Sequence, residues 1–151
     1  MPEGAPPISP LLFYRDPKAA LDFLERAFGF ETRMVVETGD GGVVHSESAF
    51  EGLAVMVVGP PAGPAASPLD LGGRVTGHVH VQLRGGIDAL CERARAAGAR
   101  IEREPADQPY GDRVFTCFDP EGQSWSFGQT VEVLTPEEWD RRTGARTRGS
   151  L

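Results

Sequence analysis

The stretch LERAFGFETR (residues 24–33) returns later in the chain as CERARAAGARIER (residues 91–103). Both copies begin inside a segment whose apolar residues recur at the three- and four-residue spacing of an amphipathic helix. In each copy a glycine, Gly29 or Gly98, ends that pattern, as glycine commonly does at a helix C-terminus. The chain therefore contains an internal repeat with one helix in each copy.

Strand-like runs flank both helices in the same order. One run precedes each helix and three follow it. In the first half the runs cover residues 10–14, 31–37, 43–50 and 53–58. In the second half they cover residues 78–83, 100–103, 113–118 and 124–129. Both halves are thus predicted to be βαβββ units.

The repeat predicts an α+β fold of two tandem βαβββ modules that form a curved mixed sheet around a cleft. One module alone would leave a face of its sheet uncovered, so two modules must pack together. We expect a single domain over residues 1–151. Its parts are module 1 at about residues 8–59, a linker at 60–74, module 2 at about 75–131, and a C-terminal helix and tail at 132–151. The linker is rich in Pro, Gly and Ala. The C-terminal helix is predicted from the capping-box pattern of Thr135, Pro136 and Glu138.

Composition narrows the classes of partner. The chain has 151 residues with a net charge of −7, and this acidity disfavours nucleic acid while it favours a cationic ligand, although solubility is the simpler explanation. No apolar run approaches the roughly 20 residues of a membrane helix, so we expect no membrane partner. The first residues lack the pattern of a signal peptide, which predicts a cytoplasmic location. Two cysteines are too few for a disulfide framework.

Three stretches carry a family resemblance: YRDPKAALDFLERAFGFE (residues 14–31), TGHVHVQL (76–83) and DRVFTCFDPEGQSWSFGQ (112–129). They resemble the glyoxalase/bleomycin resistance protein/dioxygenase superfamily, also called the vicinal oxygen chelate superfamily. The YGDR and DPEG-x-x-WSFGQ motifs are most similar to its PhnB-like, glyoxalase-like branch. The resemblance covers roughly residues 8–131 and implies a fold far more than a function.

The resemblance also implies where a metal would bind. Metal-dependent members place one ligand on each of four strands, and these positions correspond here to Ser9, Val57, His78 and Ser126. Only His78 is a good ligand, and a catalytic divalent ion needs several such donors and an open position. We therefore expect no cofactor and a degraded metal site. The alternative is a displaced divalent-metal site built from His45, Glu47 and the H-x-H motif of residues 78–80.

Side-chain alternation predicts which face of each strand lines a pocket. Val79, Val81 and Leu83 share one face of their strand, whereas the intervening polar residues share the other. In this superfamily the second, polar face lines the concave pocket. The alternative is a sheet without a ligand, on which these residues face solvent. For Arg113 the alternative is an ion pair within the 110–113 loop. The expected pocket residues are Ser9, Phe13, His45, Glu47, His78, His80, Gln82, Tyr110, Arg113, Phe115, Ser124 and Ser126.

These observations predict a protein that binds a small organic molecule, for sequestration or resistance. The alternative is a lyase, isomerase or dioxygenase-like enzyme that uses a rearranged metal site, or His78 as a general acid/base. Whether the chain is an enzyme stays open at this point. The resemblance further implies a homodimer.

Overall fold

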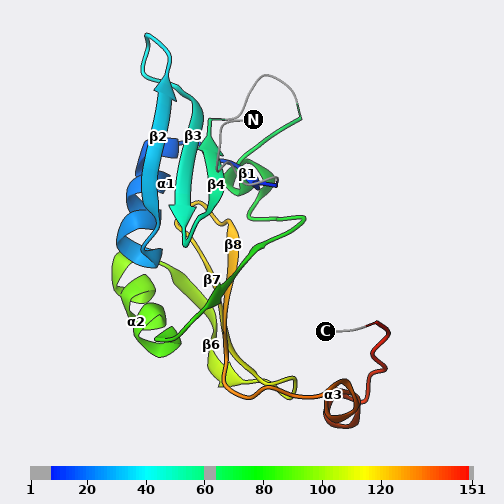
Figure 1. Ribbon diagram of the computed structural model, residues 1–151. Helices are drawn as coiled ribbons and strands as arrows, with labels where there is room; N and C mark the ends of the chain where they lie inside the picture. The colour runs from blue at the N-terminus through cyan, green and yellow to red at the C-terminus, as the bar shows by residue number, and fades with distance from the viewer. Residues whose placement is uncertain (1–7, 60–63, 150–151) are drawn as a thin grey trace.

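The computed structural model describes residues 8–59 and 64–149 and contains two four-stranded sheets (Figure 1). The first module comprises β1 (Leu11–Phe13), α1 (Pro17–Phe23), η1 (Leu24–Phe28), β2 (Glu31–Glu37), β3 (Val43–Phe50) and β4 (Leu53–Val58). The second comprises β5 (Val79–Leu83), α2 (Ile87–Ala97), β6 (Arg100–Asp107), β7 (Asp112–Phe118) and β8 (Ser124–Thr130). Between them lies η2 (Pro68–Leu71), and α3 (Pro136–Thr143) follows.

The two sheets have the same topology. Their strand orders are β1-β4-β3-β2 and β5-β8-β7-β6, and in each the first strand runs parallel to the last while the other pairs are antiparallel. The predicted α+β fold of tandem βαβββ modules is therefore confirmed. Within the described residues the strands form two separate mixed sheets, and no pairing between strands joins them into one.

The first helix begins and ends where the sequence indicates. The Asp16 carboxylate accepts a hydrogen bond from the Ala19 N–H at 3.0 Å, and Pro17 occupies the first helical position. The helix continues through the π-helical turn η1 to Gly29, whose φ of +77° favours glycine. A Cβ at Gly29 would also lie 2.7 Å from the Arg93 guanidinium of α2, which donates to the Ala27 carbonyl at 3.0 Å. Gly29 therefore lets the helices of the two modules approach each other.

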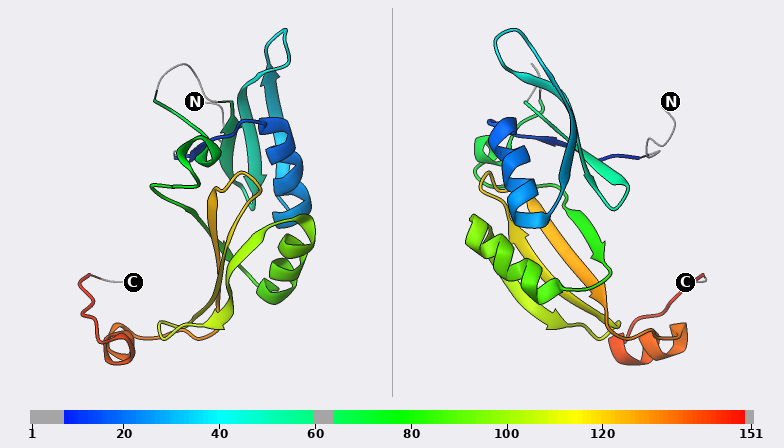
Figure 2. Two further views of the ribbon diagram at one scale, coloured as in Figure 1. Left: turned by 180° about the vertical axis from the view of Figure 1, so that it is seen from behind. Right: turned by 60° about the vertical axis from the view of Figure 1, so that its left-hand side comes forward.

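Both helices cover the same side of the molecule, and they lie next to each other in both views of Figure 2. Beneath them, Phe28 contacts Trp125 and Phe127 of module 2 at centroid distances of 5.2 and 4.8 Å. Phe127 in turn stacks on Phe115 of β7 at 4.9 Å. The core therefore runs continuously from one module into the other. Neither α1 nor α2 covers the opposite side of the two sheets, which we call the open face; the single turn η2 lies at its edge, next to β1 (Figure 1).

A buried carboxylate joins the two modules. Asp119, in the turn between β7 and β8, accepts a hydrogen bond from the Tyr14 hydroxyl at 2.6 Å and one from the Trp125 indole N–H at 3.1 Å. Burial raises the pKa of Asp119, although both of these hydrogen bonds favour its charged form. Tyr14 follows β1, so this contact fixes the turn of module 2 against the first strand of module 1.

The same turn holds the start of α1. The Glu121 carboxylate accepts hydrogen bonds from the backbone N–H groups of Arg15 and Asp16 at 2.7 and 2.8 Å. The Gln123 side chain donates to the Phe13 carbonyl at 3.0 Å. The DPEG motif of residues 119–122 is thus an inter-module connection as well as a hairpin turn.

Some boundaries differ from the prediction. β6 extends to Asp107 instead of residue 103, because two register irregularities, one on each side of Arg103, let the strand continue past Pro105. The predicted linker includes the single turn η2, whose first residues are capped by a hydrogen bond from the Leu69 N–H to the Ser67 hydroxyl. Residues 60–63 of this linker lie outside the described part.

The capping box of α3 is confirmed. Among the described residues, no helix is long and apolar enough to cross a bilayer.

The Tyr14–Asp119 contact predicts a measurable loss of stability. Tyr14→Phe removes one donor from a buried carboxylate, which costs about 1–3 kcal/mol in free energy of unfolding. Urea denaturation of Tyr14→Phe, Asp119→Asn and the double variant measures the coupling. We expect the losses to be non-additive, since the two groups share one hydrogen bond; additive losses would contradict the assignment.

Two phenylalanines that were both expected in the pocket differ in the structure. Phe115 is fully buried against Phe127, whereas Phe13 is partly exposed on the open face. Phe115→Ala should therefore lower the free energy of unfolding by about 3–5 kcal/mol through cavity formation. Phe13→Ala should cost roughly 1 kcal/mol. Denaturant unfolding of the two variants compares them directly, and equal losses would be inconsistent with this difference in burial.

Candidate functional site

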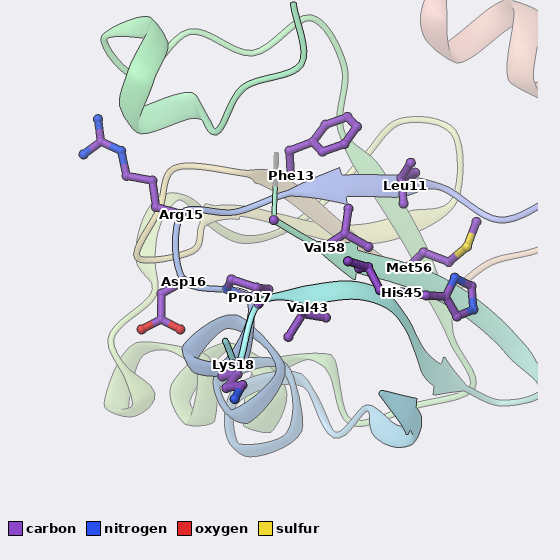
Figure 3. A pocket seen from close by; sticks show the side chains of 14 residues that line it. Leu11, Phe13, Arg15, Asp16, Pro17, Lys18, Val43, His45, Met56 and Val58 are labelled. Atoms are coloured by element: carbon purple, nitrogen blue, oxygen red, sulfur yellow. The ribbon is translucent and has the colours of Figure 1, made fainter. Parts of the chain in front are cut away.

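The open face of module 1 contains an apolar cleft of about 690 Å³ (Figure 3). Its floor is formed by Leu11 and Phe13 of β1, which pair in register with Met56 and Val58 of β4. These residues alternate with Leu12 and Val57, which pack into the core, so the pleat of two parallel strands places four apolar side chains on the open face. We call this site the apolar cleft. Such a surface suits the apolar part of a small molecule.

Charged groups at the rim of the apolar cleft are already paired. The Lys18 ammonium lies 2.7 Å from the Glu37 carboxylate, and Arg15 forms an ion pair with Asp70. His45 also lines the cleft, and its imidazole lies 3.7 Å from the Glu47 carboxylate. The cleft therefore presents an apolar floor with two ion pairs and the His45 imidazole around it.

The open face of module 2 carries a polar network instead. His80 Nδ1 lies 2.8 Å from the Ser126 Oγ, and His80 Nε2 lies 3.0 Å from the Gln82 Oε1. The Gln82 amide nitrogen then donates to the Thr130 hydroxyl at 3.1 Å and to the Asp112 carboxylate at 3.4 Å. The predicted residues His80, Gln82 and Ser126 are thus brought together.

Donor and acceptor chemistry fixes the direction of the bonds that Gln82 makes. A carboxylate only accepts, so the Gln82 amide nitrogen must face Asp112 and its oxygen must face His80. The His80 Nε2 therefore carries a proton and donates to Gln82 Oε1. The His80 Nδ1 and the Ser126 hydroxyl share the remaining bond. Every ring nitrogen of His80 is consequently engaged within the protein.

Gly128 makes room for this network, and the sequence analysis missed it. A Cβ at Gly128 would lie 2.7 Å from the Gln82 Oε1 and 3.0 Å from the His80 Cε1. The imidazole and the amide therefore lie flat over the backbone of β8. A glycine inside an aromatic strand is the sequence signal for such a close approach. Thr130 and Asp112, which orient Gln82, were also absent from the predicted set.

The remaining predicted histidine lies elsewhere. His78 and Ser124 line a different cleft of about 430 Å³, next to Pro68 and Leu71 of η2. The parallel register pairs His80, and not His78, with Ser126. Ser9 precedes β1 and is partly exposed. The structure therefore makes His80 the histidine that contacts Ser126.

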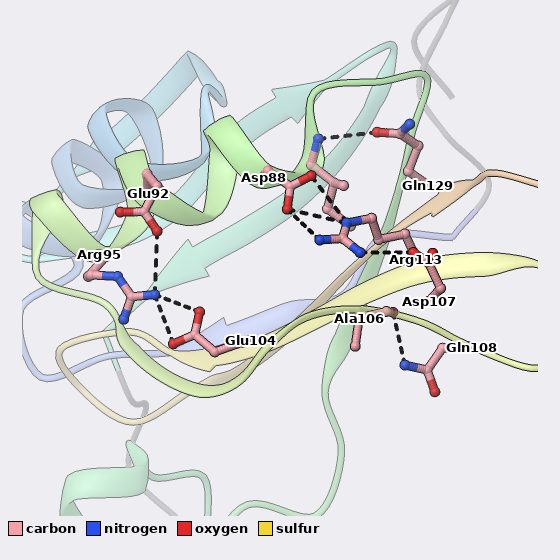
Figure 4. Close-up of polar contacts among 10 residues, drawn as sticks. Asp88, Glu92, Arg95, Glu104, Ala106, Asp107, Gln108, Arg113 and Gln129 are labelled. Carbon is pink, nitrogen blue, oxygen red and sulfur yellow. Dashed lines mark hydrogen bonds and ion pairs between the residues drawn. The ribbon is translucent and has the colours of Figure 1, made fainter.

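The expected pocket residues are divided among separate clefts and do not form one pocket. Three of them, Tyr110, Arg113 and Phe115, make contacts away from these clefts, and those expectations are corrected. Phe115 belongs to the core beneath the helices. Arg113, on the same side of β7, forms ion pairs with Asp88 of α2 and Asp107 of β6, each at 2.8 Å (Figure 4). These carboxylates raise the pKa of its guanidinium. Tyr110 stacks on Trp139 of α3 at 5.8 Å, on the C-terminal arm.

The positions that the resemblance assigns to a metal do not fit one. Val57 is fully buried in the core and has no ligating atom. The Ser126 hydroxyl is a weak neutral donor that already bonds to His80, and His78 lies in a separate cleft. Across residues 8–59 and 64–149, no three His, Cys, Asp or Glu side chains group closely enough to hold an ion. The proposed combination of His45 and Glu47 with the H-x-H motif is likewise not assembled there.

The cysteines offer no nucleophile. Cys91 and Cys117 are both fully buried in the core. Burial raises the pKa of the Cys117 thiol to about 12 and also raises that of Cys91. Both thiols are therefore held in the unreactive, protonated form near neutral pH.

Comparisons with known proteins agree with this architecture. An uncharacterized protein of Mycobacterium tuberculosis (strain ATCC 25618 / H37Rv) is 35% identical over 138 residues, which cover 88% of this chain and 79% of that protein. The crystal structure of TioX from Micromonospora sp. ML1 superposes with a TM-score of 0.64 at 30% identity, over 82% of this chain and 99% of TioX.

Two more distant structures share the fold. FosX of Listeria monocytogenes, a fosfomycin resistance protein, matches with a TM-score of 0.62 at 18% identity, over 89% of this chain and 98% of FosX. TnmS3, an antibiotic binding protein from Streptomyces sp. CB03234, matches with a TM-score of 0.61 at 22% identity, over 83% of this chain and 98% of TnmS3.

The family profile agrees with the repeat, the sheet topology and these neighbours. It is that of the Glyoxalase/Bleomycin resistance protein/Dioxygenase superfamily, and it matches residues 8–127. With two βαβββ modules and a match over most of its length, the chain belongs to the glyoxalase/bleomycin resistance protein/dioxygenase superfamily.

Proposed function

We propose that this protein binds a small, largely apolar organic molecule on its open face, without a metal, for sequestration or resistance. The observation that carries the proposal is the Ser126–His80–Gln82 network. Metal-dependent relatives often have an acidic ligand where this chain has Ser126, and here that position is occupied by a neutral hydroxyl committed to His80. The apolar cleft, which residues of module 1 line, offers apolar surface for binding.

Two neighbours support a small-molecule ligand. TnmS3 is described as an antibiotic binding protein and FosX as a fosfomycin resistance protein, one of whose structures contains Mn(II). We infer that this chain resembles the binding members in function, because three of the four positions of the metal site lack a strong donor. The PhnB-like branch and a cytoplasmic location remain predictions.

The enzymatic alternative has two candidate residues. His78 lines the cleft of about 430 Å³, and His80 faces the network on the open face. Both ring nitrogens of His80 make hydrogen bonds within the protein, so a substrate would have to displace one of them, or exchange its proton through the Ser126 hydroxyl, before His80 could act on it. This requirement favours binding over proton transfer.

We also propose that two chains form a homodimer across their open faces. Module 1 exposes Leu11, Met34 and Val36 there, each more than two-fifths accessible. Exposed apolar side chains on one face of a sheet commonly mark an interface or a ligand site. A second chain placed over it would enclose the apolar cleft.

The binding proposal predicts that ligand affinity depends on the apolar cleft and is independent of metal. A thermal-shift screen of apolar natural products, repeated with EDTA, should give the same hits with unchanged dissociation constants. Leu11→Asp places a charge on the floor of the cleft and should weaken binding at least about tenfold, or about 1.4 kcal/mol. Val133→Asp, at a site 90% exposed on the C-terminal arm, is the matched control and should bind normally. Affinity lost with EDTA and restored by a divalent metal would refute the proposal.

The dimer proposal predicts a mass of twice the 16.2 kDa chain in sedimentation equilibrium. A dissociation constant near 1 µM corresponds to a binding free energy of about 8 kcal/mol. At about 50 µM, well above that constant, the dimer should dominate. Val36→Lys should shift the equilibrium toward monomer, because it places a charge in the apolar patch. A wild-type chain that sediments as a monomer at this concentration would rule the dimer out.

A further inference from the structure

A third cavity, of about 290 Å³, lies where module 1 meets the edge strand β5. We call it the junction pocket. Module 1 lines it with the aromatic pair Phe30 and Phe50 and with Leu53 and Ala54 of the β3–β4 hairpin. From β5 come the apolar Val79 and Val81 and the polar His80 and Gln82. It therefore brings together an aromatic wall from one module and a mixed apolar and polar edge from the other.

The aromatic wall is rigid. The Phe30 and Phe50 rings lie 5.3 Å apart, and Phe30 also meets Trp125 edge to face at 5.7 Å. Phe30 and Trp125 are both buried in the core that spans the two modules. The wall thus needs no rearrangement to receive a flat ring, for which offset or edge-to-face contacts are favourable.

The polar side of the junction pocket carries no uncompensated charge. His80 and Gln82 are satisfied by the network with Ser126 and Thr130, so they do not need a hydrogen bond from a ligand. The one carboxylate in the lining, Glu51, forms an ion pair with Arg84 at 3.1 Å. A charged ligand would lose hydration here without gaining a free partner, and a neutral ligand would not.

We propose that the junction pocket binds a small, neutral, planar aromatic compound, or the neutral aromatic end of a larger ligand. The volume of about 290 Å³ is near the lower end of ligand cavities and limits the ring system to roughly one or two fused rings. This inference rests on the proposed small-molecule function and adds a second binding site, with its own ligand class, to the apolar cleft. It also replaces the cationic ligand that net charge alone would favour.

Trp125 provides an intrinsic probe of the junction pocket. It lies directly behind Phe30, whereas the second tryptophan, Trp139, stacks on Tyr110 of the C-terminal arm. Trp139→Phe therefore leaves one fluorophore next to the junction pocket. Trp125 is fully buried, so it is shielded from collisional quenchers in solvent. A parallel titration of N-acetyl-tryptophanamide corrects for light that the added compound absorbs.

The experiment titrates the Trp139→Phe protein with three matched nitroaromatics: methyl 4-nitrobenzoate, which is neutral, 4-nitrobenzoate, an anion, and 4-nitrobenzylammonium, a cation. We expect saturable quenching by the neutral ester, with a dissociation constant in roughly the high-micromolar to millimolar range for a ligand of this size. Both charged probes should bind at least about tenfold more weakly. Equal affinity of the three probes, or no saturable quenching, would overturn the proposal.

Two further variants locate the bound probe. Ala54→Leu fills the junction pocket and should abolish quenching, while its far-UV circular dichroism shows that the chain is folded. Glu51→Gln removes the partner of Arg84, so the anionic probe should gain several-fold in affinity and the neutral ester should not change. An unchanged response of the anionic probe to Glu51→Gln would contradict the charge-balance argument even if Ala54→Leu failed to fold.

Leu11→Asp separates this inference from the proposed function. The neutral ester should bind Leu11→Asp as it binds the wild type, since Leu11 lines the apolar cleft and not the junction pocket. If Leu11→Asp abolishes quenching and Ala54→Leu does not, the ligand occupies the apolar cleft; the ligand class assigned to the junction pocket is then wrong, while the proposed function stands. If the thermal-shift screen also finds no ligand, both fail.

Discussion

The hydrogen bond from the Tyr14 hydroxyl to the buried Asp119 carboxylate determines how the two halves of the chain meet. A carboxylate removed from water must be compensated, and Asp119 is compensated by groups from both modules. Because Trp125 is the second donor, the same oxygen also orients the largest side chain of the core. The relative position of β1 and β8, and with it the placement of the two open faces, follows from this one contact.

From that placement the two open faces acquire different chemistry. On module 1, parallel pairing of β1 with β4 gathers four apolar side chains. On module 2, parallel pairing of β5 with β8 sets His80 directly beside Ser126, and Gly128 leaves the space that lets the imidazole lie over the strand. One scaffold thus carries an apolar cleft and a self-satisfied polar network, and the junction pocket borders the network at His80 and Gln82.

The sequence could predict what depends on local periodicity. The repeat around residues 24–33 and 91–103 defined both modules, and alternation assigned His80, Gln82 and Ser126 to the open face. Phe115 and Arg113 were misassigned because alternation alone does not say which side of β7 faces the helices, and a shift of one residue exchanges the two faces. The stacking of Tyr110 on Trp139 and the pairing of His80 with Ser126 join residues far apart in the chain, so no local pattern indicated them.

The closed network on module 2 has a consequence for hydration. Its imidazole, amide and hydroxyl groups spend their hydrogen-bonding capacity on one another, so water above this surface has few fixed partners. Water that is held loosely is released favourably when an apolar molecule replaces it. Gln82, by closing the network, therefore lowers the number of fixed water sites over His80 and over its own amide, while the Asp112 carboxylate at the far end keeps free acceptor sites.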